Sequence, residues 1–308
     1  MFGKKGDAML PSNRRDFLLG SLAVGAVGLH ATSSAAIEPI RRQGRSLLRL
    51  SLAAYSFRQV LDLRRKPPTM TLDGFIDLAA SLPFDAVELT EYYFPQTTNA
   101  YLAQLKGRCT RLGLDVSGTA IRSDFCVNNS TRLKEEIDHV KRWVEHTSRL
   151  GGKTIRIFAG TVAATDTLDR ARRQCIDAIQ EASEYAGQFG VYLALENHGG
   201  ITATPESMLA LVRAIKSDWF GVNFDSGNFR TKNPYADLER IVPYAVVAQL
   251  KTEIHREGMK AEEADLKRLI QMLRTANFRG YVVLEYEAAE DPKTAIPRYA
   301  RILREMCG

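Results

Sequence analysis

Short apolar runs alternate along this chain with longer segments in which apolar residues recur at helical spacing. The short runs predict buried strands, and the spacing of three and four between apolar residues predicts helices that cover them. The predicted strands are residues 47–57, 84–89, 114–121, 153–158, 191–196, 220–225, 244–251 and 280–287. The predicted helices are residues 71–82, 100–113, 130–151, 168–189, 205–215, 236–241, 265–276 and 294–306.

These segments form consecutive strand–helix units, and no linker between them is long enough to mark a second domain. Strict alternation of strands and helices favours a parallel sheet covered by helices. Eight such units in about 270 residues are typical of a (β/α)₈ TIM barrel, which is an α/β fold. A doubly wound open sheet is the alternative, but no turn between a strand and a helix carries a glycine-rich phosphate-binding motif. We therefore expect residues 37–308 to form a single (β/α)₈ barrel domain.

The first 36 residues have the layout of an export signal. Arg14 and Arg15 precede a short, glycine-containing apolar stretch that ends in small residues. The run RRDFL resembles the core of a twin-arginine signal, and the apolar stretch is too short to span a membrane stably. We therefore expect residues 1–36 to direct export by the Tat route, so that the mature protein begins near Ile37 and is periplasmic or otherwise outside the cytoplasm. The alternative is a basic, disordered tail before a short buried helix.

Charge and cysteine content narrow the classes of function. The formal net charge is +6, and the first 36 residues contribute +2 of it, with four basic and two acidic residues. The other basic residues are scattered, which does not favour a nucleic-acid partner. The cysteines include no close pair, so neither a thiolate zinc site nor a redox motif is indicated. They are Cys109, Cys126, Cys175 and Cys307.

Oxygen-bearing side chains end four consecutive predicted strands, at Glu196, Asp225, Gln249 and Glu285. Because the strands of a barrel end at one rim, where active sites form, we expect these side chains to lie together. Converging carboxylates repel one another unless a cation separates them, and ligands that are all oxygen suit Mg²⁺ or Mn²⁺ best. The four residues therefore predict a divalent metal site, with Mn²⁺ or Mg²⁺ favoured over Co²⁺ or Zn²⁺. The alternative is that each acidic residue caps a helix or pairs with a lysine.

The period of two along a strand adds further residues to this rim. His198 follows Glu196 by two residues and is a candidate base, with an unreactive loop histidine as the alternative. Lys251 follows Gln249 by two residues in the same way. We expect four residues to orient substrate hydroxyl groups, namely Asn228, Lys251, Glu91 and Arg156. An ion pair with Glu88 inside the barrel is the alternative for Arg156.

The strand ends LALENHGG, NFDSGN, AQLKTE and VVLEYE resemble those of the xylose isomerase-like TIM barrels, over nearly all of the chain after residue 36. That superfamily includes sugar isomerases, sugar 3-epimerases and the family-two apurinic endonucleases. In the epimerases, strands five to eight supply a Glu, an Asp, a His and a Glu that bind one divalent metal. The resemblance implies that role for Glu196, Asp225 and Glu285. The chain departs from the epimerases in having Gln249 at the histidine position, and Asn228 where they have a histidine three residues after the aspartate.

The number of histidines excludes the endonuclease branch, whose trinuclear zinc site needs several of them. The chain has five, of which His30 lies in the predicted signal and His139 and His146 lie on a predicted helix. Only His198 and His255 remain. We therefore expect no nucleic-acid partner.

The resemblance implies a metal-dependent sugar isomerase or epimerase that forms an enediolate beside a metal-bound sugar carbonyl. Glu196 and Glu285 would then act as base and acid from two sides of the substrate. Related barrels cleave 3-keto-glycosides by metal-assisted β-elimination, and this lyase reaction, with His198 as base, stays open. An exported sugar-binding barrel without catalysis is a third hypothesis. The expected partner is a small sugar or keto-glycoside, and assembly into a homo-oligomer also stays open.

Overall fold

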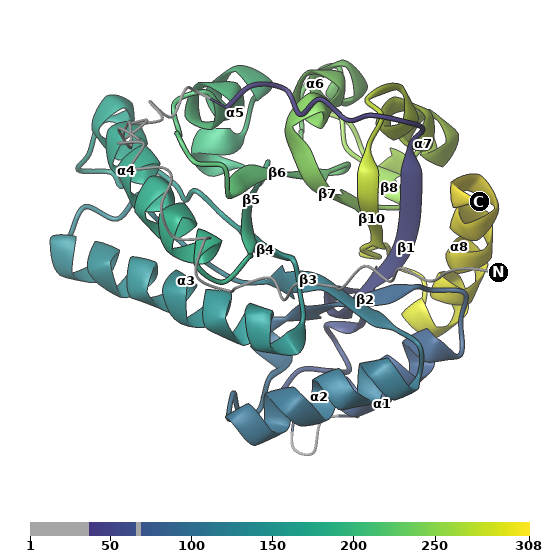
Figure 1. Cartoon of the computed structure of the whole chain (residues 1–308). Coiled ribbons are helices and arrows are strands. Elements are labelled where there is room, and N and C mark those ends of the chain that lie inside the picture. Colours follow the sequence, from purple (N-terminus) through teal and green to yellow (C-terminus); the bar gives the residue numbers. More distant parts are fainter. Residues whose placement is uncertain (1–36, 66–68) are drawn as a thin grey trace, which may run out of the picture. The chain divides into compact units, whose positions relative to one another are not determined.

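Eight parallel strands close into a barrel in the computed structural model of the protein, which describes residues 37–65 and 69–308 (Figure 1). Strands β1 to β7 follow one another around the ring, and β10 closes it between β7 and β1. The predicted (β/α)₈ barrel is therefore confirmed. The predicted export signal, residues 1–36, lies outside the described residues.

The barrel strands are β1 (Leu47–Ala53), β2 (Ala86–Thr90), β3 (Asp115–Ala120), β4 (Thr154–Ile157), β5 (Tyr192–Glu196), β6 (Phe220–Asp225), β7 (Ala245–Leu250) and β10 (Arg279–Leu284). The helices are α1 (Leu72–Ala80), α2 (Asn99–Arg111), α3 (Ser130–Leu150), α4 (Leu168–Gly187), α5 (Pro205–Val212), α6 (Pro234–Ile241), α7 (Leu266–Thr275) and α8 (Pro292–Cys307). Every predicted unit is present. The strand predicted over 47–57 is too long, because the chain leaves β1 after Ala53 and forms a 3₁₀ turn over Ala54–Phe57.

A small antiparallel pair stands apart from the barrel, in the loop that follows β7. It consists of β8 (Glu253–Ile254) and β9 (Glu262–Glu263). We did not predict it, because two residues are too few to show a strand period. The pair lies directly after the carboxyl end of β7, and it therefore borders the rim where active sites of this fold form.

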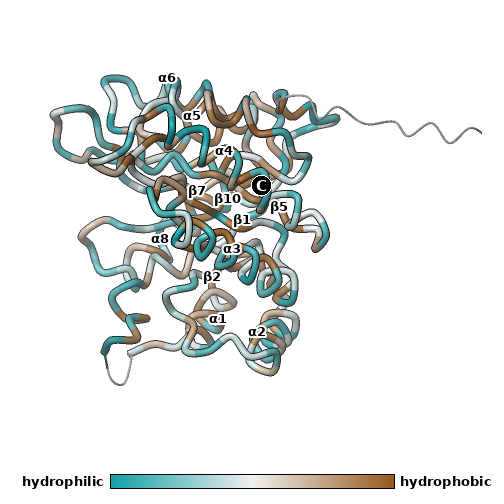
Figure 2. The backbone as a smooth tube through the Cα atoms, turned by 90° about the vertical axis from the view of Figure 1, so that its left-hand side faces the viewer, coloured by the Kyte–Doolittle hydropathy of each residue, from teal (hydrophilic) through white to brown (hydrophobic). Residues whose placement is uncertain are grey.

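The apolar core has two parts, inside and outside the sheet. The larger part lies between the strands and the helices. Figure 2 shows the central strands mostly in brown, the hydrophobic colour, and the surrounding helices with more of the hydrophilic teal. The smaller part fills the barrel interior with Ala53, Ala86, Ala194, Val247, Tyr281 and Val283. Ala194, Val247 and Val283 share strand parity with Glu196, Gln249 and Glu285, so polar side chains lie above an apolar floor.

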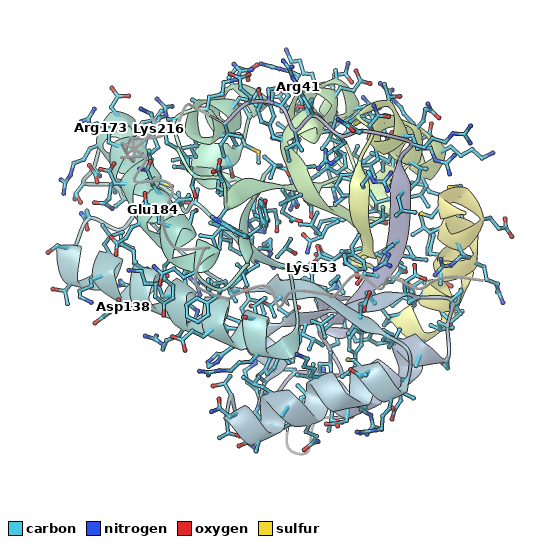
Figure 3. All side chains as sticks on the ribbon, in the orientation of Figure 1. Arg41, Asp138, Lys153, Arg173, Glu184 and Lys216 are labelled. Atoms are coloured by element: carbon cyan, nitrogen blue, oxygen red, sulfur yellow. The ribbon has the colours of Figure 1, made fainter. Side chains whose placement is uncertain are left out.

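The outer faces of the helices are polar. Arg173 and Glu184 project from α4, and Lys216 follows α5 (Figure 3). Within the described part of the chain, no helix has the length and apolarity that crossing a membrane requires. The buried apolar residues of the helices pack in one cluster with those of the strands.

Candidate active site

A cavity of about 440 Å³ opens at the carboxyl ends of the strands. Six of the nine predicted site residues line it, namely Arg156, Glu196, His198, Asn228, Lys251 and Glu285. Two others, Asp225 and Gln249, are fully buried at the ends of neighbouring strands, where their Cα atoms are paired in register. Eight of the nine predicted residues therefore lie at the same end of the barrel.

Glu196, at the end of β5, forms a buried ion pair with Arg156 of β4. Arg156 Nε lies 2.9 Å from Glu196 Oε2, and the two side chains are 4% and 3% exposed. Asn228 donates a hydrogen bond of 2.7 Å to Glu196 Oε1. The guanidinium of Arg156 also stacks on the ring of Phe158, 4.1 Å from the ring centre. Arg156 thus pairs with Glu196, and the structure does not favour the alternative of a pair with Glu88.

Lys251 lies among three carboxylates. Its Nζ is 2.7 Å from Glu285 Oε2 and 3.4 Å from Asp225 Oδ2, and it also contacts the carboxylate of Glu287. We did not predict Glu287, although it follows Glu285 by the same period of two that identified Lys251. The ammonium neutralises part of the negative charge that these acidic residues bring to the rim.

Gln249 faces deeper into the barrel than the rim carboxylates. Its Oε1 accepts a hydrogen bond of 2.5 Å from Asn223, and its Nε2 donates one of 2.7 Å to Glu88 Oε1. Both ends of the amide are therefore occupied by side chains of the barrel interior. Asn223 and Glu88 were missing from the predicted site, although Asn223 precedes Asp225 by two residues and so shares its face.

Asp225 is held from two directions. Asn197 brackets its backbone, donating to Asp225 O at 2.9 Å and accepting from Asp225 N at 3.0 Å. Its Oδ1 accepts from the Gly227 N–H at 2.8 Å, while its buried Oδ2 has no hydrogen-bond donor among the described residues and faces Lys251. Asn197 therefore fixes the end of β6 relative to the end of β5.

The predicted ligand set does not fit a divalent metal ion in this arrangement. No three His, Cys, Asp or Glu side chains within residues 37–65 and 69–308 form a group that could hold one. Lys251 lies where Asp225 and Glu285 approach each other, and Gln249 turns its oxygen to Asn223. An added cation would meet the charge of Lys251 at close range, where like charges repel strongly. The divalent metal stays a prediction.

Burial and neighbouring charges shift the pKa values of the carboxyl groups of the site in different directions. Burial raises the pKa of Glu196, although Arg156 opposes the shift. Burial also raises the pKa of Asp225 well above its ordinary value, despite the nearby Lys251. For Glu285, burial is outweighed by Lys251 and Arg156, which together hold its pKa below the ordinary value. Neighbouring carboxyl groups whose pKa values are pushed apart are characteristic of acid–base sites.

Glu88 yields a testable dependence of stability on pH. Burial, and then the charge of Glu285, raises its pKa from 4.5 to about 8. Between these two pH values the folded protein keeps a proton that the unfolded chain has released, so the free energy of unfolding falls as pH rises. The slope from this one group is at most about 1.4 kcal/mol per pH unit.

Glu88→Gln is therefore expected to raise the free energy of unfolding at pH 8, with a gain that shrinks toward pH 4.5. Glutamine keeps an acceptor for the Gln249 amide but removes the titrating carboxyl. Urea unfolding of both proteins between pH 5 and pH 8 measures the difference, and the exposed Glu263→Gln serves as the control. A difference that stays constant over this pH range would contradict the assignment.

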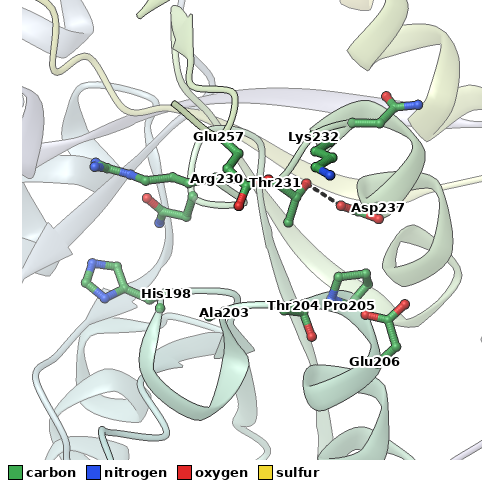
Figure 4. A pocket seen from close by; sticks show the side chains of 13 residues that line it. His198, Ala203, Thr204, Pro205, Glu206, Arg230, Thr231, Lys232, Asp237 and Glu257 are labelled. Carbon is green, nitrogen blue, oxygen red and sulfur yellow. Dashed lines mark hydrogen bonds between the residues drawn. The ribbon is translucent and has the colours of Figure 1, made fainter. Parts of the chain in front are cut away.

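His198 lies at the mouth of the cavity. Its ring stacks on Phe158 with centroids 4.1 Å apart and planes 29° apart, and its backbone N–H donates to Thr202 Oγ1 at 3.0 Å. A second hollow of about 790 Å³ adjoins the first and shares His198, Asn228 and Arg230 with it (Figure 4). Arg230 was not predicted, because it lies in the loop after β6, where no strand period marks it. His198 therefore stands where the two hollows meet.

Glu91 is not brought to the other predicted residues. It lies in the 3₁₀ turn Glu91–Tyr93 that follows β2. Its carboxylate accepts from the backbone N–H of Arg122 at 3.2 Å and lies 2.8 Å from His139 Nε2 on α3. These contacts link the β2 turn to α3, and a role for Glu91 in substrate binding stays a prediction.

A sequence profile described as "Xylose isomerase-like TIM barrel" matches residues 76–306. The chain belongs to this family. An uncharacterized protein of Methanocaldococcus jannaschii is 22% identical to it over an alignment of 259 residues, and the match covers 76% of this chain and 87% of that protein. The matched region runs from α1 to α8 and so includes every strand end that contributes to the site.

Two solved structures of similar fold are informative. The 3-keto-D-glucoside 4-epimerase from E. coli has a TM-score of 0.63 and 17% identity, and the match covers 85% of this chain and 100% of that chain. A xylose isomerase-like TIM barrel protein from Mycobacterium smegmatis was solved in complex with magnesium. It has a TM-score of 0.64 and 14% identity, and the match covers 84% of this chain and 96% of that chain. At these identities the likeness shows the shared fold of the family alone.

Proposed function

We propose that the protein is a sugar isomerase or epimerase that removes a proton from the carbon beside a sugar carbonyl. The observation that carries the proposal is that Glu196 and Glu285 line one cavity, from strands that lie three steps apart around the ring. Each carboxylate has a basic partner, Arg156 for Glu196 and Lys251 for Glu285. Two carboxyl groups facing one substrate are what a reversible proton transfer between carbon atoms or faces needs.

In the proposed reaction, one glutamate accepts the proton as the electron pair of the C–H bond moves toward the carbonyl oxygen. An enediolate results, and the other glutamate returns a proton to the neighbouring carbon or to the opposite face. Epimerisation breaks and re-forms only the C–H bond. Isomerisation also transfers the proton of the neighbouring hydroxyl to the former carbonyl oxygen, so that this hydroxyl carbon becomes the new carbonyl. Neither reaction needs an oxidant. Asn228 keeps Glu196 in position through its hydrogen bond to Oε1. The epimerase name of the E. coli barrel supports this class of reaction.

One observation favours a second candidate, cleavage of a 3-keto-glycoside by β-elimination. The hollow lined by Thr204, Arg230 and Lys232 gives room for a substituent beyond the sugar ring (Figure 4). His198 lies where this hollow meets the cavity that contains the glutamates. Elimination starts with the same proton removal and ends with loss of the substituent on the next carbon, so the two reactions differ only in the second step.

The test is deuterium exchange. Incubation of the protein in D₂O with ketohexoses and with 3-keto-glycosides is expected to place deuterium on a carbon next to the carbonyl, which NMR detects. A new sugar isomer identifies the isomerase or epimerase, and release of the aglycone identifies the lyase. Binding without exchange, both with and without added Mn²⁺ or Mg²⁺, would contradict the proposal and leave a sugar-binding barrel.

A further inference from the structure

We propose that the ammonium group of Lys251 takes the place of a divalent cation in this site, so that the proton transfer between Glu196 and Glu285 requires no metal. The inference rests on the proposed function for the reaction that Lys251 serves. It concerns a position that the sequence alone assigned only to the orientation of hydroxyl groups.

The contacts of Lys251 are those expected of the central cation of the site. Its Nζ lies 2.7 Å from Glu285 and 3.4 Å from Asp225, which are two of the four residues that the sequence predicts as metal ligands. A third carboxylate, Glu287, completes its surroundings. The side chain is only 13% exposed, so these interactions act in a largely dry environment where charge counts for more than in water.

The backbone and a glycine determine where this lysine lies. The Lys251 N–H donates to Ser226 Oγ at 2.8 Å, which ties the end of β7 to the turn after β6. Gly227 leaves space for the stem, because a Cβ at that position would lie 2.7 Å from Lys251 Cδ and 3.1 Å from Lys251 Cβ. The ammonium is thus directed to the carboxylates by the fold, in addition to being attracted by their charge.

The remaining predicted ligands are occupied in a way that a metal ion would not use. Glu196 is paired with Arg156, and the oxygen of Gln249 accepts from Asn223 inside the barrel. Mg²⁺ prefers six oxygen ligands in octahedral geometry. Instead, each rim carboxylate has a basic partner. Arg156 pairs with Glu196 at the end of β5, and Lys251 pairs with the carboxylates at the ends of β6 and β10.

Lys251 can reach a substrate without leaving its buried partners. Glu287 is the most exposed of its three carboxylates, at 35%, and both residues line the cavity. A sugar carbonyl oxygen can therefore replace Glu287 as one of the acceptors of the ammonium. As a glutamate takes the proton from carbon, the electron pair reaches this oxygen, and Lys251 N–H groups stabilise the developing negative charge. The lysine donates hydrogen bonds but keeps all its protons.

The first test compares metal binding by the wild type and by Lys251→Met, using Mn²⁺ as the probe and electron paramagnetic resonance as the readout. The wild type is expected to bind no stoichiometric Mn²⁺, and the variant, which lacks the ammonium among its carboxylates, is expected to bind it. The control is Lys267→Met on the exposed face of α7. Lys251→Arg retains the charge and should exclude Mn²⁺ as the wild type does. One Mn²⁺ bound per wild-type chain would overturn the proposal, whatever the variants do.

The second test is catalytic. Deuterium exchange by the wild type is expected to be unchanged by EDTA and by added Mn²⁺, and Lys251→Met is expected to lower it by about 10²–10³-fold, the usual effect of removing one oxyanion donor. Exchange that EDTA abolishes and Mn²⁺ restores would overturn the proposal. If the wild type exchanges no keto sugar under any condition, the proposed function fails, and the Mn²⁺ titration still decides whether Lys251 replaces the metal.

Discussion

Glu196→Gln is expected to lower the rate of deuterium exchange into a keto sugar by about 10²–10⁴-fold, the range that a general acid or base usually contributes. Glutamine retains the shape of the side chain and an acceptor for Asn228, but it carries no proton between carbon atoms. Glu285→Gln should cause a loss of similar size, because the reaction needs both a proton acceptor and a proton donor. NMR of exchange at saturating sugar measures both variants.

Two controls make this prediction specific. The exposed Glu263→Gln should leave the exchange rate unchanged. His198→Asn separates the glutamate pair from the histidine at the mouth of the cavity, and its effect should be less than about tenfold if the glutamates carry the transfer. If Glu196→Gln exchanges deuterium at the wild-type rate and His198→Asn loses most of its exchange, the assignment of the glutamates as acid and base is wrong and His198 is the base.

Arg156→Met is expected to lower the free energy of unfolding by about 3–5 kcal/mol, because it leaves Glu196 buried without its basic partner. The loss includes the stacking of the guanidinium on Phe158 and its 2.8 Å hydrogen bond to the carbonyl of Ile121. Urea unfolding at pH 7 measures it. The double variant Arg156→Met/Glu196→Gln should be more stable than Arg156→Met, since the second change removes the unpaired charge.

A surface pair supplies the comparison for this loss. Arg268 and Glu239 lie 3.2 Å apart and are about half exposed, so Arg268→Met should cost no more than about 1 kcal/mol. A loss in Arg156→Met as small as that of Arg268→Met would show that the buried pair contributes little. Failure of the double variant to recover stability would assign the loss to packing against Phe158.

The fold could be predicted because its signal repeats in every strand–helix unit. Apolar runs and amphipathic segments alternate from β1 to α8, and each predicted unit is present in the barrel. The ends of the strands are harder to predict. The apolar run after Leu47 continues to Phe57, yet the strand stops at Ala53, because an apolar 3₁₀ turn has the same composition as the end of a buried strand.

The site could be predicted in part, because the period of two tells which residues share the barrel face but not how deep they lie. Gln249 was assigned to the rim beside Glu285, whereas its amide bonds to Glu88 and Asn223 in the interior. Lys251, two residues later, has the rim position. The stagger of neighbouring strands sets these heights, and counting along a single strand does not reveal it.

Positions beyond the strands were the hardest to predict. Glu91 follows β2 directly, but a 3₁₀ turn replaces the extended chain there, so the period of two no longer applies. Arg230 lines the cavity from a loop, where side chains do not alternate between two faces as they do along a strand. The strand alternation that identified Glu196 and Glu285 therefore has no counterpart for loop residues that complete a barrel site.

The absence of a side chain at Gly227 links two positions that follow neighbouring strands, β6 and β7. A methyl group there and the stem of Lys251 would compete for the same space. During evolution the two residues are therefore not free to change independently, and a lineage that acquires a larger residue in the turn after β6 must shorten or redirect residue 251. Within a family of barrels whose overall identities are low, a glycine and a lysine that vary together would mark a subgroup with its own chemistry.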